Sequence, residues 1–409
     1  MKALVLREHG GLENLKVVHD HPMPVAKEGW VVIRVRASSF NYHDVFTVKG
    51  MPGIKVPLPV VIGLDMAGDI HEVGAGVTGW KVGDRVLVNP LNKKIGLQGE
   101  MLDGGMAEYC AVSAEQLIRM PDAVSYEDAS ALPVAYGTAL RMMVTNGHIQ
   151  KGEKVLILGA SGGVGVCCLQ LAKAAGCEVI ACAGTDAKAK RLQELGADKT
   201  INYVEKDFMK EVYAMYGKPT RRGGGTNLGV DVVVNYTGGD TWVPSLKVLK
   251  VGGRLLTCGA TAGYAPAEDI RFIWTFELKV LGSNGWMRQD IATLLDMVQQ
   301  GKLKVLIDKT FPLKDAREAL RVIEDRVLEE DRRVVAAELQ DLPLVDRLRR
   351  DVLPDRDAAG EGDEVHVGVG QHLVGDLARI PGDHREHLRG EPGLVEQVRE
   401  EERGQGRLL

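Results

Sequence analysis

A group of closely spaced glycines, which follows a short apolar run, could hold a phosphate. The run from Val155 to Leu158 is typical of a strand buried on both faces of a parallel sheet, and a helical pattern from Val164 to Ala175 follows the glycines. A strand, a glycine turn and a helix in this order place backbone N–H groups and a helix N-terminus against an anion. Glycines leave room there for a pyrophosphate, because no Cβ blocks its approach. The residues predicted to bind it are Gly159, Ser161, Gly162, Gly163, Val164 and Gly165.

The segments around this loop favour a dinucleotide over a tight turn that binds nothing. The helical pattern ends at Gly176, and Glu178 to Cys182 is a second strand pattern, so the stretch has the length of a βαβ unit. Further strand patterns at Val230 to Val234 and Arg254 to Cys258 are each followed by glycines. Ligand-binding loops at the carboxyl ends of strands are typical of an open parallel sheet.

The end of the second strand bears on which nicotinamide cofactor would bind. NAD sites usually carry an acidic residue there, about 20 residues beyond the glycine loop, whereas this strand ends at Gly184 without one. Thr185 and Lys188 suit the 2′-phosphate of NADPH through charge-assisted hydrogen bonds. Two alternatives stay open. Asp186 could bind the ribose of NAD from a shifted loop, and Lys188 could lie with Lys190 on a solvated helix face.

Composition bounds the class of protein. The chain has 409 residues, 45% of them hydrophobic and 26% charged, which is ordinary for a globular protein of two domains. A formal net charge of -5 gives no reason to expect nucleic acid or an anionic membrane as a partner. No apolar run is long enough to span a bilayer, and the N-terminus begins with a strand pattern, so we expect a cytoplasmic protein. The six cysteines form no Cys-x-x-Cys pair, which argues against a zinc knuckle or a disulfide framework.

The sequence pattern divides the chain into segments. Residues 1–124 contain short alternating runs separated by Gly and Pro, as in a small β-barrel-like domain. Residues 125–282 alternate helix and strand, which predicts an α/β doubly wound parallel sheet. Residues 341–409 lack Lys, Ser, Thr, Asn, Cys, Met and aromatic side chains. We expect this last segment to be a disordered or loosely docked tail, because it has little apolar surface to bury.

Several motifs lie in a fixed order along residues 1–326. Besides the glycine loop, they are Asn41-Tyr-His-Asp44, Pro59-Val-Val-Ile-Gly-Leu-Asp65, Gly83-Asp-Arg-Val86, Gly105-Met-Ala-Glu-Tyr109, Leu132-Pro-Val-Ala-Tyr-Gly-Thr-Ala139 and Leu195-Gly-Ala-Asp198. Together they resemble the medium-chain dehydrogenase/reductase superfamily, in its zinc-independent branch of quinone oxidoreductases and enoyl (crotonyl-CoA) reductases. The resemblance implies a GroES-like catalytic domain, an inserted Rossmann domain that binds NADP, a return to the catalytic domain over residues 283–340, and usually a homodimer. It ends near Arg326, after which Arg333 to Ala337 is the candidate closing strand.

The same resemblance argues against a catalytic metal. Zinc-dependent members of the superfamily hold the ion with a Cys, a His next to an acid, and a further Cys or acid. This chain has Asn41, Leu64 beside Asp65, and the apolar Pro133-Val-Ala135 at the corresponding positions. Zinc takes three protein ligands from Cys, His and carboxylate side chains, and Leu64 cannot serve as one. We therefore expect no metal.

The resemblance implies hydride transfer from NADPH to a small-molecule acceptor that is already electrophilic, such as a quinone or an α,β-unsaturated carbonyl. It places Asn41, Tyr42, His43 and Asp44 by the nicotinamide. Asn41 would donate to the acceptor oxygen, Tyr42 or His43 would deliver a proton, and Asp44 would hold the loop; all four could instead be turn-formers. For the cofactor, the resemblance adds Thr138, Thr185, Lys188, Tyr203, Asn235, Gly259, Ala260 and Thr261.

Three other functions stay open. An enoyl-thioester (crotonyl-CoA-like) reductase would need a basic mouth for the CoA phosphates, for which Lys93-Lys94 and Arg221-Arg222 are the candidates. A zinc-type alcohol dehydrogenase would need the metal that the donor positions disfavour. A non-catalytic nucleotide-binding adaptor would keep the glycine loop and lose turnover.

Overall fold

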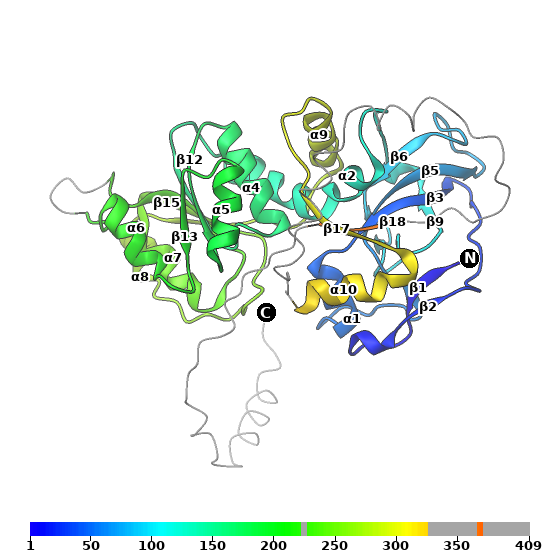
Figure 1. Ribbon diagram of the computed structural model, residues 1–409, viewed down its shortest axis with the longest axis horizontal. Helices are drawn as coiled ribbons and strands as arrows, with labels where there is room; N and C mark the ends of the chain where they lie inside the picture. The colour runs from blue at the N-terminus through cyan, green and yellow to red at the C-terminus, as the bar shows by residue number, and fades with distance from the viewer. Residues whose placement is uncertain (222–226, 326–365, 371–409) are drawn as a thin grey trace, which may run out of the picture. The chain divides into compact units, whose positions relative to one another are not determined.

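A six-stranded parallel sheet carries the glycine loop. The computed structural model describes residues 1–221, 227–325 and 366–370 (Figure 1). In the sheet, the strand order is β13-β12-β11-β14-β15-β16. Because β11 and β14 are neighbours although they are distant in sequence, the direction of winding reverses between them, and ligands bind at such a switch point. The strands are β11 (Lys154–Ile157), β12 (Glu178–Ala183), β13 (Lys199–Asn202), β14 (Val230–Val234), β15 (Leu249–Thr257) and β16 (Lys279–Gly282).

Both faces of this sheet are covered, which explains the uninterrupted apolar runs. Val155 and Ile157 pack in the core that includes α4 (Gly163–Ala174), while Leu156 and Leu158 pack in the core on the opposite face. The first face also receives α3 (Gly137–Leu140), α5 (Asp186–Glu194) and α9 (Arg288–Gln299). The second receives α6 (Phe208–Tyr216), α7 (Trp242–Lys247) and α8 (Arg271–Thr275). The predicted doubly wound sheet is confirmed.

The N-terminal segment forms a separate β-rich core, as the alternating runs predict. A seven-stranded sheet has the order β10-β6-β5-β3-β18-β17, with β9 also paired to β3, and a smaller sheet has the order β2-β1-β4. Helix α1 (Tyr42–Lys49) belongs to this core, and α2 (Tyr126–Ser130) follows β10. The strands are β1 (Ala3–Leu6), β2 (Leu15–Val18), β3 (Trp30–Ser39), β4 (Val60–Val61), β5 (Asp65–Val73), β6 (Arg85–Val88), β7 (Leu91–Asn92), β8 (Gly96–Leu97), β9 (Tyr109–Ser113) and β10 (Leu117–Arg119).

The chain returns to the first core later than residue 283. Ile291 and Leu294 of α9 still pack with the Rossmann core, whereas Phe311 of β17 (Ile307–Pro312) and Leu320 of α10 (Ala316–Asp325) pack with the β-rich core. A short strand, β18 (His366–Gly370), completes the seven-stranded sheet between β3 and β17. We expected a disordered or loosely docked tail over residues 341–409, and β18 is a strand within that range.

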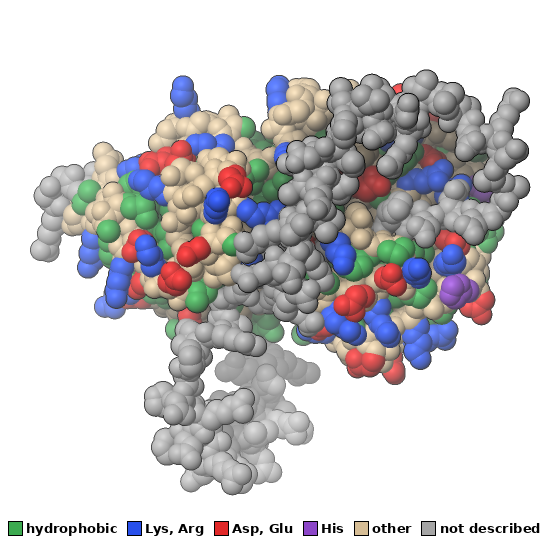
Figure 2. Space-filling model, in the orientation of Figure 1, with side chains coloured by type: hydrophobic (Ala, Val, Ile, Leu, Met, Phe, Trp, Pro, Cys, Tyr) green, Lys and Arg blue, Asp and Glu red, His purple; other side chains and the backbone are tan. Residues whose placement is uncertain are grey.

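The described surface carries both positive and negative side chains. Figure 2 shows Lys and Arg side chains interspersed with Asp and Glu over the coloured part of one face. Within the described residues, no helix has the length and apolar character needed to cross a membrane. The candidate strand over residues 333–337 lies outside the described part of the chain.

Candidate active site

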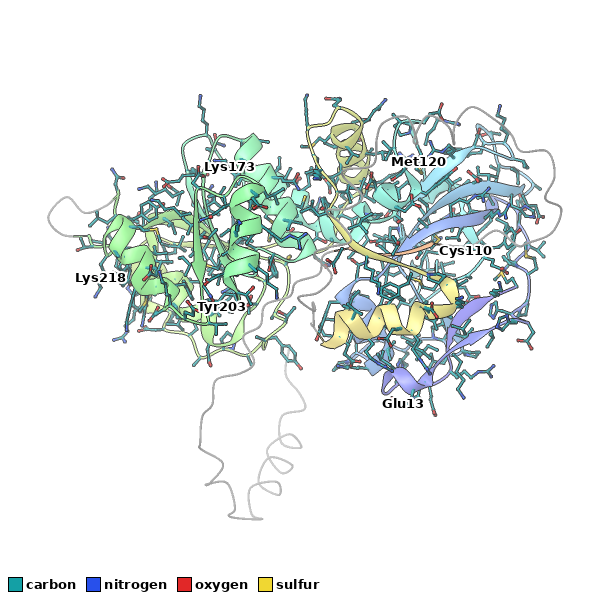
Figure 3. All side chains as sticks on the ribbon, viewed as in Figure 1. Glu13, Cys110, Met120, Lys173, Tyr203 and Lys218 are labelled. Carbon is teal, nitrogen blue, oxygen red and sulfur yellow. The ribbon has the colours of Figure 1, made fainter. Side chains whose placement is uncertain are left out.

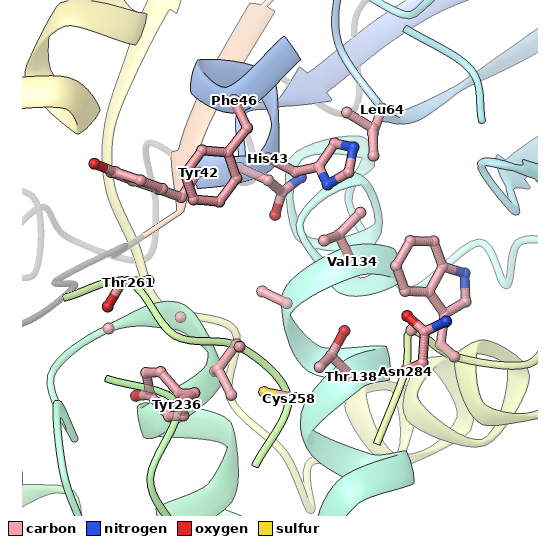
Figure 4. Close-up of a pocket in the computed structure, with 18 of the residues that line it drawn as sticks. Tyr42, His43, Phe46, Leu64, Val134, Thr138, Tyr236, Cys258, Thr261 and Asn284 are labelled. Atoms are coloured by element: carbon pink, nitrogen blue, oxygen red, sulfur yellow. The ribbon is translucent and has the colours of Figure 1, made fainter. Parts of the chain in front are cut away.

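A cavity of about 400 Å³ lies where the loops after β11, β14 and β15 meet α1 and the helical stretch around α3. Figure 4 shows Tyr42, Phe46 and His43 on one side of it and Thr138, Cys258 and Thr261 on the other. With Asn284 to Trp286, which follow β16, four strands of one sheet contribute loops at their carboxyl ends, as expected near a switch point. Of the predicted residues, the cavity wall contains Asn41, Tyr42, His43, Thr138, Gly162, Gly163, Val164, Gly259, Ala260 and Thr261.

The glycine loop forms the turn that the sequence predicts, but its last glycine has a different role from the one expected. Gly159 has φ +63, and Gly162 precedes α4. A Cβ on Gly165 would lie 2.6 Å from Ala160 Cα and 2.6 Å from Gly159 O, so this glycine lets α4 pack against the turn rather than clearing space for a phosphate. The Tyr236 hydroxyl donates to Gly159 O at 2.6 Å, a contact that sequence reasoning missed. The turn fits a dinucleotide pyrophosphate, since its backbone opens onto the cavity at Gly162 and Gly163.

The residues predicted around a 2′-phosphate gather at the end of β12, outside the cavity wall. Thr185 caps α5, and its hydroxyl accepts from the Lys188 backbone N–H at 3.3 Å. Tyr203, labelled in Figure 3, follows β13, and its backbone N–H donates to Ala183 O at 3.1 Å. Asp186, the alternative ligand for a ribose, accepts from Asn202 Nδ2 at 2.9 Å. The carboxylate is therefore already engaged at the start of the helix.

Asn235 does not face the cavity, contrary to the expectation that it binds the cofactor. Its side chain is fully buried; Nδ2 donates to the hydroxyls of Thr241 and Ser245 at 3.0 and 2.9 Å, and Oδ1 accepts from the backbone N–H groups of Thr237 and Gly238 at 2.9 Å. Two donor hydrogens and two acceptor positions are the whole capacity of a primary amide. Asn235 therefore shapes the turn after β14, and the neighbouring Tyr236 is the residue that lines the cavity.

Asn41 begins α1 and is tied to a buried carboxylate. Its Nδ2 donates to Asp65 Oδ2 at 2.9 Å, and Asp65 also accepts from the Val134 backbone N–H at 3.2 Å and from the Ser39 hydroxyl at 3.5 Å. Burial raises the pKa of Asp65 well above its usual value. The side chain of Leu64 lies in the cavity wall beside this network. Two of the positions that hold zinc in metal-dependent members of the superfamily thus carry an amide and a hydrocarbon, and the third lies in the apolar stretch Pro133 to Ala135.

Asp44 lies at the N-terminus of α1 and not in the cavity wall, a position that suits the loop-holding role rather than contact with the reacting group. It is fully buried, and it accepts from the backbone N–H groups of Asn41 at 2.7 Å and Gly63 at 3.1 Å. Burial raises its pKa to about 7, against the opposing effect of these hydrogen bonds. Asp44 therefore fixes the turn that presents Tyr42 and His43.

Tyr42 and His43 are presented to the cavity by the first turn of α1. The rings of Tyr42 and Phe46 meet edge to face with centroids 5.0 Å apart, as expected for residues one turn apart on a helix. His43 Nε2 lies 2.7 Å from Glu100 Oε2. Sequence reasoning missed Glu100, because it lies in the loop of residues 89–105, which has little periodicity.

Trp286 closes another part of the wall. Its exposed fraction is 9%, and its Nε1 donates to Asn89 Oδ1 at 2.9 Å. The Cβ that an alanine would add at Gly137 would lie 2.9 Å from Trp286 Cβ, so the glycine leaves the space in which the tryptophan sits. The wall around Trp286, Tyr42 and Phe46 is mainly apolar and aromatic. Such a surface suits a flat organic molecule.

The candidate basic mouth for CoA has less support from the structure than the apolar wall has. Lys93 and Lys94 are exposed in the turn between β7 and β8. Arg221 donates to Thr275 O at 2.7 Å and to Glu277 Oε1 at 2.9 Å, so its guanidinium is engaged within the same surface. Arg222 lies outside the described residues.

Comparison with known proteins gives the family. Residues 27–122 match the alcohol dehydrogenase GroES-like domain, and residues 163–300 match the family described as zinc-binding dehydrogenase. The chain is 30% identical to the synaptic vesicle membrane protein VAT-1 homolog of Danio rerio, over 80% of this chain and 68% of that protein. It is 30% identical to crotonyl-CoA reductase of Streptomyces avermitilis, over 74% and 78%. It is 28% identical to human (Homo sapiens) quinone oxidoreductase, over 78% and 92%.

Solved structures agree. An NAD-dependent alcohol dehydrogenase superposes with a TM-score of 0.73 at 34% identity, over 81% of this chain and 97% of that one. The 2-octenoyl-CoA carboxylase reductase CinF, in complex with NADP and 2-octenoyl-CoA, superposes with a TM-score of 0.68 at 26% identity, over 80% and 85%.

The chain belongs to the medium-chain dehydrogenase/reductase superfamily. It falls in the branch of the quinone oxidoreductases and crotonyl-CoA reductases, as its motifs predict. It is accordingly an oxidoreductase enzyme, and members of this superfamily use nicotinamide cofactors and act on small molecules.

Proposed function

We propose that this enzyme reduces a quinone or an α,β-unsaturated carbonyl compound with NADPH and without a metal. The observation that carries the proposal is that Asn41, which is hydrogen-bonded to Asp65, and Leu64 occupy positions that hold zinc in metal-dependent relatives. An amide and a hydrocarbon give zinc no ligand, and the carboxylate is bonded to Asn41, Val134 and Ser39. With no Lewis acid to polarise it, the acceptor must be electrophilic by itself.

NADPH would supply the hydride, and this chain's residues would hold it. Gly162, Gly163 and Val164 would face the pyrophosphate from the start of α4. Thr185, Lys188 and Tyr203 would take the 2′-phosphate, and the engagement of Asp186 by Asn202 favours this choice over NAD. Thr138 and the loop Gly259 to Thr261 would flank the nicotinamide side of the cavity.

The protein's own contribution to the reaction is orientation and exclusion of water. Tyr42, Phe46 and Trp286 would hold a planar acceptor by their apolar faces. Asn41 lines the cavity and donates to Asp65, so we assign it to holding this part of the wall.

A cofactor titration with matched variants tests the NADPH part of the proposal. Lys188→Ala should weaken NADPH binding about tenfold and leave NADH binding unchanged, because it removes one charge-assisted contact to the 2′-phosphate. Lys190, an exposed lysine of the same helix, is the control, and Lys190→Ala should change neither affinity. Equal loss of NADPH and NADH affinity in the Lys188 variant would contradict the assignment.

An acceptor panel tests the reaction. NADPH consumption is followed with quinones, small enones and an enoyl-CoA. We expect turnover with quinones or enones; selective turnover of the enoyl-CoA would favour the thioester reductase instead. Cofactor binding without consumption for every acceptor would favour a non-catalytic nucleotide-binding protein.

We also propose a cytoplasmic homodimer. Six free thiols suit a reducing compartment. Strand β16 ends the described six-stranded sheet, and its Val280 is 38% exposed, which leaves an edge for pairing with a second copy. A single monomer mass in solution would contradict the dimer.

A further inference from the structure

The cavity contains a histidine that is paired with a buried carboxylate. His43 Nε2 and Glu100 Oε2 are 2.7 Å apart, and the exposed fractions of the two side chains are 29% and 7%. His43 lines the cavity, whereas Glu100 lies behind it and is not part of the wall. Burying a carboxylate costs free energy unless it is paired, so the contact with His43 stabilises Glu100 in its buried position.

The contact with Glu100 determines which nitrogen of the His43 ring can exchange a proton with another partner. We assign the hydrogen of this contact to Nε2, with the Glu100 carboxylate as its acceptor. Nδ1 is then the nitrogen that can gain and lose a proton toward another partner. Glu100 is the carboxyl group in direct contact with the ring, and Asp44, the next residue of α1, is the other acidic group that interacts with it.

Close backbone packing holds the two partners at this distance. Glu100 follows Gly99, where an added Cβ would lie 2.7 Å from the backbone of Gly63. The N–H of Gly63 donates to Asp44, which caps the helix that begins just before His43. The loop that carries Glu100 and the helix that carries His43 are thus fixed against one shared residue, and neither can move away without opening that packing.

We propose that His43 is the proton donor of the reduction and that Glu100 is its positioning residue. The assignment rests on the proposed function and completes its chemistry. When an enone receives a hydride at its β-carbon, the π electrons of the C=C bond move to form an enolate. The Nδ1–H bond of His43 then breaks, its proton forms a C–H bond at the α-carbon, and the ring becomes neutral. With a quinone, the proton goes to the phenolate oxygen. His43 regains a proton from water, which reaches its partly exposed ring.

Histidine suits this role better than Tyr42, the other candidate. The contact with Glu100 holds the His43 ring in one orientation in the cavity wall. Tyr42 instead packs edge to face against Phe46 and forms part of the apolar wall.

The test compares kcat against pH for an enone, with the NADPH affinity measured in parallel. His43→Gln should lower kcat about 100-fold, which is the lower end of the range for loss of a general acid. It should also flatten the decrease of kcat at high pH. Glu100→Gln keeps the shape of the side chain but removes its charge. It should lower kcat about tenfold and move the fall in kcat to lower pH, because the imidazolium loses its counter-charge. Neither change should alter NADPH affinity.

His21→Gln is the matched control, because His21 also faces a carboxylate, Asp103 at 3.7 Å, but does not line the cavity. It should leave kcat and its pH dependence unchanged. A second measurement uses D₂O: the wild-type enzyme should place deuterium on one face of the α-carbon, and His43→Gln should give both epimers.

The outcomes separate the two proposals. An active wild-type enzyme whose kcat, pH profile and deuterium stereochemistry survive both substitutions would overturn the roles of His43 and Glu100 alone. A wild-type protein that reduces no acceptor would overturn the proposed function, and the proton-donor role with it.

Discussion

Asn41 and Asp65 are joined by a hydrogen bond of 2.9 Å from Nδ2 to Oδ2, and their exposed fractions are 2% and 0%. The bond links the start of α1 to the start of β5. Asp65 also accepts a hydrogen bond from the backbone N–H of Val134. A neutral amide beside a carboxylate is a stable buried pair, whereas two carboxylates would not be. The cavity wall therefore depends on residue 41 being uncharged.

Asn41→Asp tests that dependence. The substitution nearly keeps the shape of the side chain but puts a second carboxyl group against Asp65. At pH 8 we expect the free energy of unfolding to fall by about 3 kcal/mol, the range for an uncompensated buried charge. At pH 5 the loss should be smaller, because the two groups can share a proton. Denaturant unfolding at both pH values measures the difference, and an equal loss at both would contradict the account.

Asp44 predicts a pH dependence of stability. Its pKa is raised from 3.8 to about 7, so between these values the folded protein binds a proton that the unfolded chain releases. The stability that this proton contributes is fully present below pH 3.8 and is lost as the pH rises to about 7. Wild type should therefore lose a few kcal/mol relative to Asp44→Asn across this window. Denaturant unfolding of both proteins between pH 4.5 and 7.5, in steps of about 0.5, gives the comparison; parallel curves would refute it.

Gly137→Ala should impair acceptor binding. The added Cβ would lie 2.9 Å from Trp286 Cβ, and the indole must shift away from its bond to Asn89. We expect the KM for the acceptor to rise several-fold with little change in the KM for NADPH. Gly282→Ala is the control, since nothing lies within 4 Å of its added Cβ. An unchanged acceptor KM in the Gly137 variant would show that Trp286 does not bound the acceptor site.

The sheet and the glycine turn could be predicted from sequence because their signals are local. The run Val155 to Leu158 is apolar since both faces of β11 are buried, and the glycines that follow it turn the chain into α4. Neighbouring residues in the sequence are enough to recognise both features. The order of the strands in the sheet could not be predicted in this way, because a local pattern does not say which strands pair.

The contacts that complete the site are not local. Glu100 lies 57 residues from His43, Asn89 lies 197 from Trp286, and Tyr236 lies 77 from Gly159. No periodicity links such pairs, and only the folded chain brings them together. For Asn235, the resemblance predicted a cofactor ligand that the structure does not place at the cavity. Its side chain turns inward and is hydrogen-bonded within its own loop.

The most direct test of metal-free reduction is NADPH consumption before and after exhaustive treatment with a chelator. Quinones and small enones serve as acceptors, and the residual zinc per chain is measured in the same samples. We expect the same rate in treated and untreated enzyme, at zinc contents far below one per chain. A rate that disappears with the metal and returns when zinc is added would contradict the account and make the protein a zinc-dependent dehydrogenase.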